Sequence, residues 1–152
     1  MTLLDAPQYD PVRARMRNIK IIGTIVIVLV LAATVWFNRY FQEKSVASKF
    51  FSALQKKDYE TAYGIYFADP TWKQHQDKYS QYPYNEFYRD WGPGGEWGVI
   101  NEYEIFWVGN CPTSGSGVIA DVIVNKRVEH AQVYIDKHDK TVSPVPCDVM
   151  IR

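Results

Sequence analysis

Several features are scarce in this 152-residue chain, and each absence narrows the class of protein. No charged residue occurs from Ile21 to Phe37, and neither proline nor glycine occurs between Thr24 and Asp58. Basic and acidic residues balance at 17 each. We therefore expect no nucleic acid partner, because phosphate binding needs a clustered basic face. No catalytic signature stands out either, so function has to be inferred from architecture.

One apolar run, Ile19 to Phe37, dominates the N-terminal part of the chain. A bilayer core about 30 Å thick needs roughly 20 apolar residues at 1.5 Å rise each. Trp36 and Tyr40 extend the run into the interface, so we predict a transmembrane helix over residues 19–40. The alternatives fit less well. A soluble core helix is rarely apolar on every face, a buried strand is shorter, and a cleaved signal peptide would continue with small residues.

Basic residues on the two sides of this run predict its orientation. They are Arg13, Arg15, Arg17 and Lys20 on one side, and Arg39, Lys44 and Lys49 on the other. By the positive-inside rule, this bias favours a cytoplasmic tail over residues 1–18 and an extracytoplasmic domain over residues 41–152. The expected location is the cell membrane, with a single pass. The lipid bilayer is then a partner, and we interpret the arginine cluster as a topology signal rather than a dedicated lipid site.

Helical spacing continues directly after the apolar run. Ala47, Phe50, Phe51 and Leu54 recur at i, i+3, i+4 and i+7 within residues 41–54. A flexible linker would have shown glycine, serine or proline runs. The membrane helix is therefore expected to continue, or to restart at Ser45, straight into the domain and to hold the domain near the membrane.

Capping residues predict three further helices. Asp58 is the expected N-cap of the first, and Asp69 followed by Pro70 opens a second that runs to about Tyr79. Pro83 opens the third, with aromatic residues at helical spacing, and the glycine-rich segment 92–95 ends it.

After this segment, the spacing of apolar residues changes from the helical repeat to the two-residue alternation of a strand. Tyr103, Ile105 and Trp107 share one parity of the first expected strand. The four expected strands are Val99–Val108, Gly117–Val128, Ala131–Ile135 and Thr141–Ile151. Pro144 and Pro146 place the last strand at the sheet edge. Helices followed by an antiparallel meander predict an α+β fold, with the helices packed on one face of a curved antiparallel sheet.

Residues 46–63, VASKFFSALQKKDYETAY, resemble the opening of nuclear transport factor 2-like domains. The shared pattern is an amphipathic helix ending in leucine, a basic-Asp-Tyr turn and a second helix with an inward alanine. The resemblance implies a cone with a pocket at its open end. The family includes isomerases and dehydratases, many non-catalytic modules, and membrane-anchored accessory proteins of the bacterial envelope. This chain departs from the family pattern in two places, a Tyr/Trp-rich insert between Asp69 and Gly98 and its closing residues.

Few residues suit catalysis in such a pocket, which would need a buried carboxylate or an Asp-His pair. Asp121 is the weak candidate, because it interrupts an apolar strand; it faces either the cavity or the outer side. His75 and Asp77 point about 200° apart on one helix. Glu86 and Asp90 lie opposite the aromatic stripe and are expected in solvent.

We expect no metal and no cofactor. His130, His138, Asp136 and Asp139 suggest a metal site at first sight. A solvated hairpin loop over residues 136–140 explains the last three better. The glycines at 92–98 lack the lysine and hydroxyl residue that end a phosphate-binding loop.

Cys111 and Cys147 are the only cysteines, and both belong to the expected outer domain. In an oxidising compartment they can close a loop of about 35 residues, worth roughly 3–4 kcal/mol in the chain-entropy model. We favour this disulfide over two free thiols. Zinc is excluded by the absence of a second ligand at suitable spacing.

Aromatic residues are concentrated in the stretch of sequence between Asp69 and Gly98. They either pack the core or present a partner surface at the mouth of the cone, where tyrosine and tryptophan are favoured anchors. The candidates for a surface are Trp72, Tyr84, Tyr88, Trp91 and Trp97.

Together these features predict a non-enzymatic single-pass membrane protein whose domain is an accessory or interaction module, such as a small subunit of a larger membrane complex. Small residues offer contacts to a neighbouring helix, namely Gly23, Thr24, Ala32, Ala33 and Thr34. The alternatives are a membrane-tethered ligand-binding or lyase/isomerase-like enzyme that uses the cone pocket, and a structural spacer.

Overall fold

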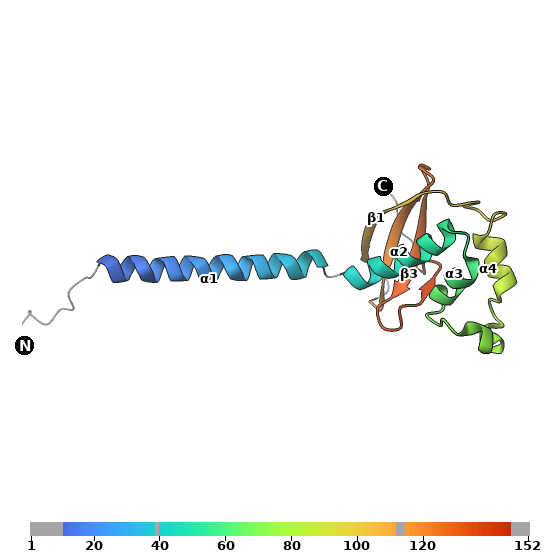
Figure 1. Cartoon of the computed structure of the whole chain (residues 1–152), viewed down its shortest axis with the longest axis horizontal. Helices are drawn as coiled ribbons and strands as arrows, with labels where there is room; N and C mark the ends of the chain where they lie inside the picture. Colours follow the sequence, from blue (N-terminus) through green and yellow to red (C-terminus); the bar gives the residue numbers. More distant parts are fainter. Residues whose placement is uncertain (1–10, 39, 112–114, 147–152) are drawn as a thin grey trace, which may run out of the picture. The chain divides into compact units, whose positions relative to one another are not determined.

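A computed structural model describes residues 11–38, 40–111 and 115–146 (Figure 1). The chain forms two units, residues 1–39 and residues 40–152. The first unit contains one long helix, and the second contains the remaining helices and an antiparallel sheet. Residues 1–10 of the predicted tail lie outside the described residues.

Helix α1 spans Pro11–Asn38. It begins at Pro11, so the helix extends into the predicted cytoplasmic tail before the predicted transmembrane segment starts at Ile19. Proline is favoured at the first helical position, and the arginines that follow are good helix formers. Within the described residues, α1 is the helix long and apolar enough to cross a membrane. Thr24 and Thr34 donate their hydroxyl hydrogens to the carbonyls four residues earlier, at 2.9 and 2.8 Å, which satisfies both groups inside the helix.

Helices α2, Phe41–Gln55, and α3, Tyr59–Tyr66, form a hairpin. The predicted cap is confirmed, because Asp58 accepts a hydrogen bond from the Thr61 amide at 3.1 Å. Lys57, with φ of 59°, makes the turn between the two helices. Helix α2 begins at Phe41 rather than Ser45, so its first turn follows α1 after only two residues.

The single helix predicted after Pro70 is wrong. The structure has two short 3-10 helices instead, η1 over Trp72–Gln74 and η2 over Gln76–Tyr79. His75 separates them with φ of −133°, outside the helical region. Residues 73–78 are polar and offer no apolar stripe that would favour α-helical packing. The next prediction is confirmed, since α4 spans Tyr84–Trp91 after Pro83 and ends at Gly92.

The sheet is a four-stranded antiparallel meander in the order β1-β2-β3-β4. Its strands are β1 Tyr103–Asn110, β2 Gly117–Val124, β3 His130–Asp136 and β4 Val142–Ser143. The last strand is much shorter than Thr141–Ile151, because Pro144 follows at once and cannot donate to the ladder. Residues 147–151 of that prediction lie outside the described residues.

A bulge in β1 overturns one predicted alternation. Ile105 pairs with Val122 and Trp107 pairs with Asp121, so Phe106 is an extra residue between them. Ile105 and Trp107 therefore lie on opposite faces of the sheet. Trp107 is 48% exposed, and its ring lies where a Cβ on Gly109 would be.

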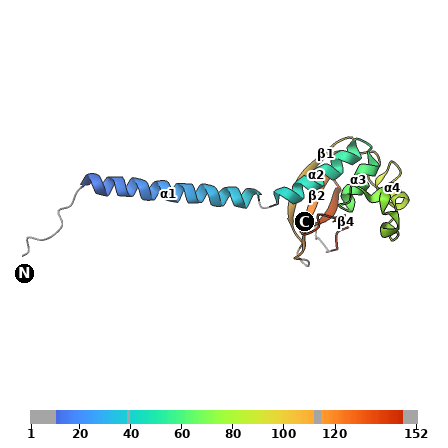
Figure 2. The same ribbon diagram turned by 60° about the horizontal axis from the view of Figure 1, so that its bottom comes forward.

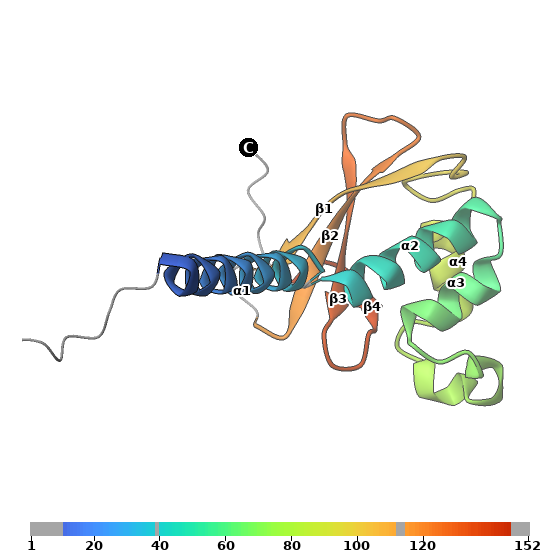
Figure 3. The same ribbon diagram turned by 60° about the vertical axis from the view of Figure 1, so that its left-hand side comes forward.

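Helices α2, α3 and α4 lie on one side of the sheet (Figures 2 and 3). Alternate residues of β2 and β3 turn toward them and enter the main core, namely Val118, Ala120, Val122, Val124, Ala131, Val133 and Ile135. Phe50 of α2 is fully buried against this set, with ring contacts to Phe51 at 5.3 Å and Trp91 at 5.1 Å. The predicted α+β class is confirmed for the second unit.

Candidate functional site

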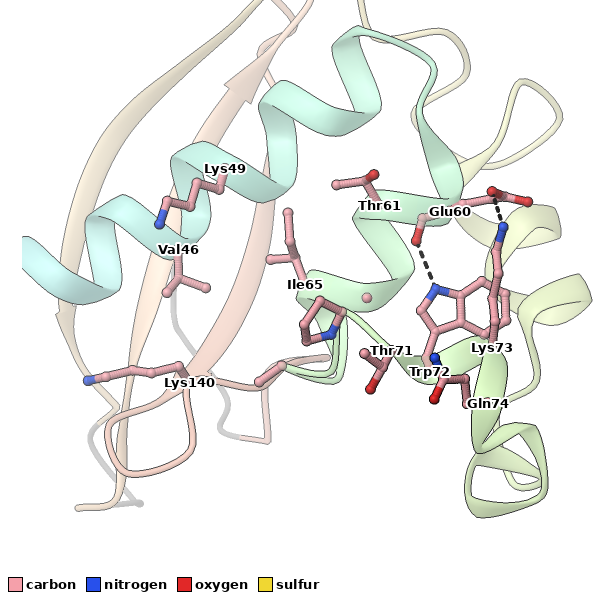
Figure 4. A pocket seen from close by; sticks show the side chains of 13 residues that line it. Val46, Lys49, Glu60, Thr61, Ile65, Thr71, Trp72, Lys73, Gln74 and Lys140 are labelled. Atoms are coloured by element: carbon pink, nitrogen blue, oxygen red, sulfur yellow. Dashed lines mark hydrogen bonds and ion pairs between the residues drawn. The ribbon is translucent and has the colours of Figure 1, made fainter.

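A groove of about 580 Å³ lies between α2, α3, η1 and the β3–β4 turn (Figure 4). Its apolar lining, which we call the floor, includes Val46, Ile65 and Pro70. A Cβ on Gly64 of α3 would lie 3.1 Å from the Asp69 carbonyl oxygen and 3.3 Å from the Trp72 ring. Glycine at this position therefore lets the segment after α3 approach and shape the floor. We call this cavity the helical groove.

Trp72 forms one wall of the helical groove. Its ring stacks on Tyr84 at 5.2 Å and meets the Tyr63 ring edge-on at 4.7 Å. The indole Nε1 donates to the Glu60 carbonyl at 3.1 Å, and Lys73 pairs with the Glu60 carboxylate. Trp72 is thus fixed by three neighbours, so the wall is rigid before any ligand arrives.

Two lysines stand at the rim of the helical groove. Lys140 Nζ lies 2.7 Å from Glu43 Oε1, and the Glu43 side chain is only 7% exposed. Lys49 is exposed and forms no ion pair within the part of the chain that the structure describes. An apolar floor beside an unpaired cation suits an amphipathic segment that carries a carboxylate or another anion.

A second cavity, of about 1020 Å³, lies where α3, η2 and α4 approach residues 141–145. Six rings line it, namely Tyr66, Phe67, Tyr79, Tyr82, Trp91 and Trp97. We call it the aromatic groove. Tyr82 donates its hydroxyl hydrogen to Asp90 Oδ2 at 2.9 Å.

The tyrosines of the aromatic groove are held neutral. Burial raises the pKa of Tyr66 to about 12, with a smaller contribution from the Asp90 charge. Burial, followed by the hydrogen bond to Asp90, raises the pKa of Tyr82 well above its usual value. Both groups therefore remain hydrogen-bond donors at neutral pH and cannot serve as bases there. Because the Tyr82 proton is already donated to Asp90, the groove offers ring faces and a fixed polar pair, which suits binding.

Asp121 lies on the face of the sheet that turns away from the helices. Its chain neighbours Ala120 and Val122 belong to the helix-facing core, and it pairs across the ladder with Gln132. Asp121 Oδ2 is 3.1 Å from His130 Nδ1, and the Phe106 ring packs edge-on against that imidazole at 5.2 Å. Asp121 therefore lines neither groove.

The Asp121–His130 pair was not foreseen from the sequence. The two residues are nine positions apart, and their contact depends on the register of the β2–β3 hairpin, in which Ile123 pairs with His130. Strand composition indicates such a hairpin but does not fix its register. Asp121 Oδ1 is buried and has no hydrogen-bond partner among the described residues.

The remaining aromatic candidates divide between core and surface. Trp91 packs on the α2 rings, as noted above. Trp97 has the Arg127 guanidinium 5.8 Å from its ring centre. Tyr88 is 44% exposed and meets the Tyr59 ring edge-on at 5.1 Å. Trp72 forms the wall described earlier, and Tyr84 stacks on it. Tyr88 is the most exposed of the five side chains.

The other predicted acid–base residues do not converge. His75 Nδ1 lies 3.5 Å from Asp69 Oδ2, while Asp77 belongs to the separate turn η2. Glu86, expected in solvent, is half-buried on α4. Asp90, expected in solvent, instead accepts the Tyr82 hydrogen bond, because η2 and the chain after it fold back along α4.

The turn over residues 136–140 is a hairpin loop, as interpreted. Asp136 Oδ1 accepts from the His138 amide at 2.7 Å, and Asp139 Oδ1 accepts from the Thr141 amide at 2.9 Å. The hydrogen bonds from Thr141 lower the pKa of Asp139. Among the residues described, no group of three or more His, Cys, Asp or Glu could hold a metal ion.

Cys111 lies directly after β1 and is 4% exposed. It packs with Ile119 and Tyr134 in a small cluster on the sheet face opposite the helices. Cys147 lies outside the described residues, so the disulfide between them stays a prediction.

The function of this chain is inferred from the geometry of its two grooves. No protein-family model, curated protein or solved structure matches it. The helical groove combines an apolar floor with cations, and the aromatic groove combines ring faces with the hydrogen-bonded pair of Tyr82 and Asp90. Both combinations favour binding over proton transfer near neutral pH.

Proposed function

We propose that this chain is a single-pass membrane protein whose C-terminal domain is a non-enzymatic binding module. The observation that carries the proposal is the exposure of α1. Its large apolar side chains are 50–72% exposed from Ile21 to Trp36, and none of its most apolar stretch is buried among the described residues of its own unit. Water is a poor solvent for such a surface, whereas lipid is a good one.

The proposed orientation follows from the flanking charges. The arginine cluster precedes the apolar stretch, so the N-terminus is cytoplasmic and the domain extracytoplasmic. The proposed location of the protein is then the cell membrane, in keeping with the resemblance to anchored accessory proteins of the bacterial envelope.

A nuclear transport factor 2-like module is the proposed identity of the domain. The order of its elements supports this, since a helical hairpin and α4 precede an antiparallel meander and pack on one face of it. The interior between helices and sheet is occupied by rings such as Phe50, Tyr63 and Phe87, each 0–1% exposed. Asp121 faces the other side, so the best catalytic candidate lines neither the helical groove nor the aromatic groove.

The proposed partner is another membrane-protein subunit. The helical groove offers a preformed surface on the domain. On α1, a Cβ at Gly23 would meet no atom within 4 Å, so another helix could approach closely there.

One observation favours a second candidate, a membrane-tethered ligand-binding protein. The aromatic groove is large enough for a small molecule, and the Tyr82–Asp90 hydrogen bond gives it a fixed polar group. Enzymatic turnover is not needed for this function.

A single purification series tests the first proposal. Membranes are washed with alkaline carbonate and then dissolved in mild detergent, and the native mass of the full chain is measured. We expect the chain to stay in the washed membranes and to migrate in a complex larger than a monomer in its micelle. Release by the wash would refute the anchor, and migration as a lone monomer would refute the subunit role.

A further inference from the structure

The first turns of α2 carry a third, smaller groove, which shares only Lys49 with the helical groove. It has a volume of about 300 Å³ and is lined by Phe41, Lys44, Ser45, Ser48, Lys49 and Ile105. The five α2 residues recur at i, i+3, i+4, i+7 and i+8, so they share one face of the helix. Ile105 of β1 closes the other side. We call this cavity the α2 groove.

The α2 groove carries uncompensated positive charge. Lys44 and Lys49 are exposed, and within the described part of the chain neither forms an ion pair. The nearest carboxylate along the helix, Glu43, is buried and held by Lys140 at 2.7 Å. The groove therefore presents two free ammonium groups and suits an anion.

The walls of the α2 groove are preorganised. Tyr103 on β1 donates its hydroxyl hydrogen to the Ser48 carbonyl at 3.0 Å, and its oxygen lies 3.2 Å from the Ser48 hydroxyl. These two contacts fix α2 against the strand. Ser45, one turn earlier, supplies a further hydroxyl on the same face.

The position of the α2 groove in the chain limits what it can meet. Phe41 follows the last residue of α1, Asn38, by three residues. Three residues span at most about 11 Å when fully extended. Phe41 is also 67% exposed, and phenylalanine is among the apolar residues that interfacial helices bury at the boundary between headgroups and acyl chains.

We propose that the α2 groove binds the phosphate headgroup of an anionic phospholipid in the bilayer that α1 spans. Lys44 and Lys49 pair with the phosphate, Ser45 donates a hydrogen bond to it, and the Phe41 ring rests at the level of the glycerol backbone. The inference rests on the membrane anchorage proposed above. It adds an oriented contact between the domain and the lipid surface, distinct from the arginine cluster on the other side of the bilayer.

Lipid titration of the full chain tests the proposal. The chain and its variants are reconstituted in nanodiscs of phosphatidylcholine alone and of an equal mixture with phosphatidylglycerol. Native mass spectrometry of the released protein then gives the affinity for each lipid. The test variant is Lys44→Gln with Lys49→Gln. The matched control is Lys56→Gln with Lys57→Gln, which removes the same charge from exposed positions at the other end of α2.

We expect the test variant to bind phosphatidylglycerol about 30-fold more weakly than the natural chain, since each lysine near an anionic surface contributes roughly a factor of 5. The control should change by less than about twofold, and phosphatidylcholine binding should not change. The arginine cluster is intact in both variants, so the difference between them reports on the α2 groove.

Three results would overturn the proposal. They are equal losses in the two variants, no loss in the test variant, and competition by inorganic phosphate as strong as that by phosphatidylglycerol, which would assign the groove to a soluble anion. Failure of anchorage is distinguishable, because the natural chain would then not enter the nanodiscs at all.

Discussion

Asp69 shows how strongly one side chain is determined by its neighbours. Its Oδ2 accepts a hydrogen bond from the Tyr79 hydroxyl at 2.6 Å, and its Oδ1 accepts two from Thr71 at 2.8 Å. These bonds, led by that from Tyr79, lower the pKa of Asp69 from 3.8 to about 2. Asp69 thereby holds the two 3-10 turns beside α3, where η1 lines the helical groove and η2 lines the aromatic groove.

The lowered pKa predicts a pH dependence at this residue. A carboxyl whose pKa is lower in the folded state stabilises the fold above pH 3.8, and the contribution is lost as the pH falls toward 2. Tyr79→Phe removes the first cause, so the Asp69 pKa should rise toward 3.8. Carboxyl-carbon NMR measures it directly.

Tyr84→Phe is the control for this titration, because Tyr84 contacts Trp72 rather than Asp69. Its Asp69 titration should match that of the natural chain. An unchanged Asp69 pKa in Tyr79→Phe would show that the Tyr79 bond is not the main cause.

At the scale of the element, α2 combines two faces with different tasks. One face buries Ala47, Phe50, Phe51 and Leu54 against the sheet and α4. The other leaves Phe41, Lys44 and Lys49 exposed in the α2 groove. Stability and surface chemistry can therefore be changed separately within one helix.

Two phenylalanines of α2 make this separation testable. Phe50→Ala should lower the free energy of unfolding by about 3–5 kcal/mol, because the residue is fully buried among rings and truncation leaves a cavity. Phe41→Ala should change it by less than about 0.5 kcal/mol, because Phe41 is 67% exposed. Urea unfolding of the full chain in mild detergent, followed by near-UV circular dichroism, compares them. Equal destabilisation would contradict the assignment of the two faces.

Much of the second unit could be predicted from the sequence because its signals are local. The Asp58 cap, the Pro83 start and the β-branched run of β2 each depend on neighbouring residues alone, and the structure has all three. The change near residue 98 from helical to alternating apolar spacing likewise predicts the boundary between the helices and the sheet.

The failures have a common physical origin in contacts between distant segments. No residue type at Phe106 indicates a bulge in the sequence, because the bulge is defined only by the pairing of β1 with β2. The Asp121–His130 contact depends on hairpin register. The grooves depend on how η1, η2 and the β3–β4 turn approach the helices, which no residue pattern specifies.

At the scale of the whole molecule, the cysteines connect fold and location. We predict that Cys111 and Cys147 are bonded, as an extracytoplasmic domain allows. Denatured chain isolated under acid quench should then react with a thiol reagent only after reduction. Labelling without reductant would contradict the disulfide and the proposed compartment together.

Variants extend the cysteine test to stability. Cys111→Ser, Cys147→Ser and the double variant should lose similar stability, roughly 3–4 kcal/mol in the chain-entropy model, because any one of them opens the same loop. A double variant much less stable than either single variant would indicate two independent thiols instead.

The two-residue separation of α1 and α2 has a consequence for how a partner finds this domain. With α1 anchored in lipid as proposed, a domain on so short a tether explores only a thin layer next to the bilayer. A subunit anchored in the same bilayer then searches for it in two dimensions, at an effective concentration far above that of a freely diffusing pair. Weak contacts in shallow grooves can therefore be sufficient for assembly, and the same contacts would go unnoticed between the detached domains in solution.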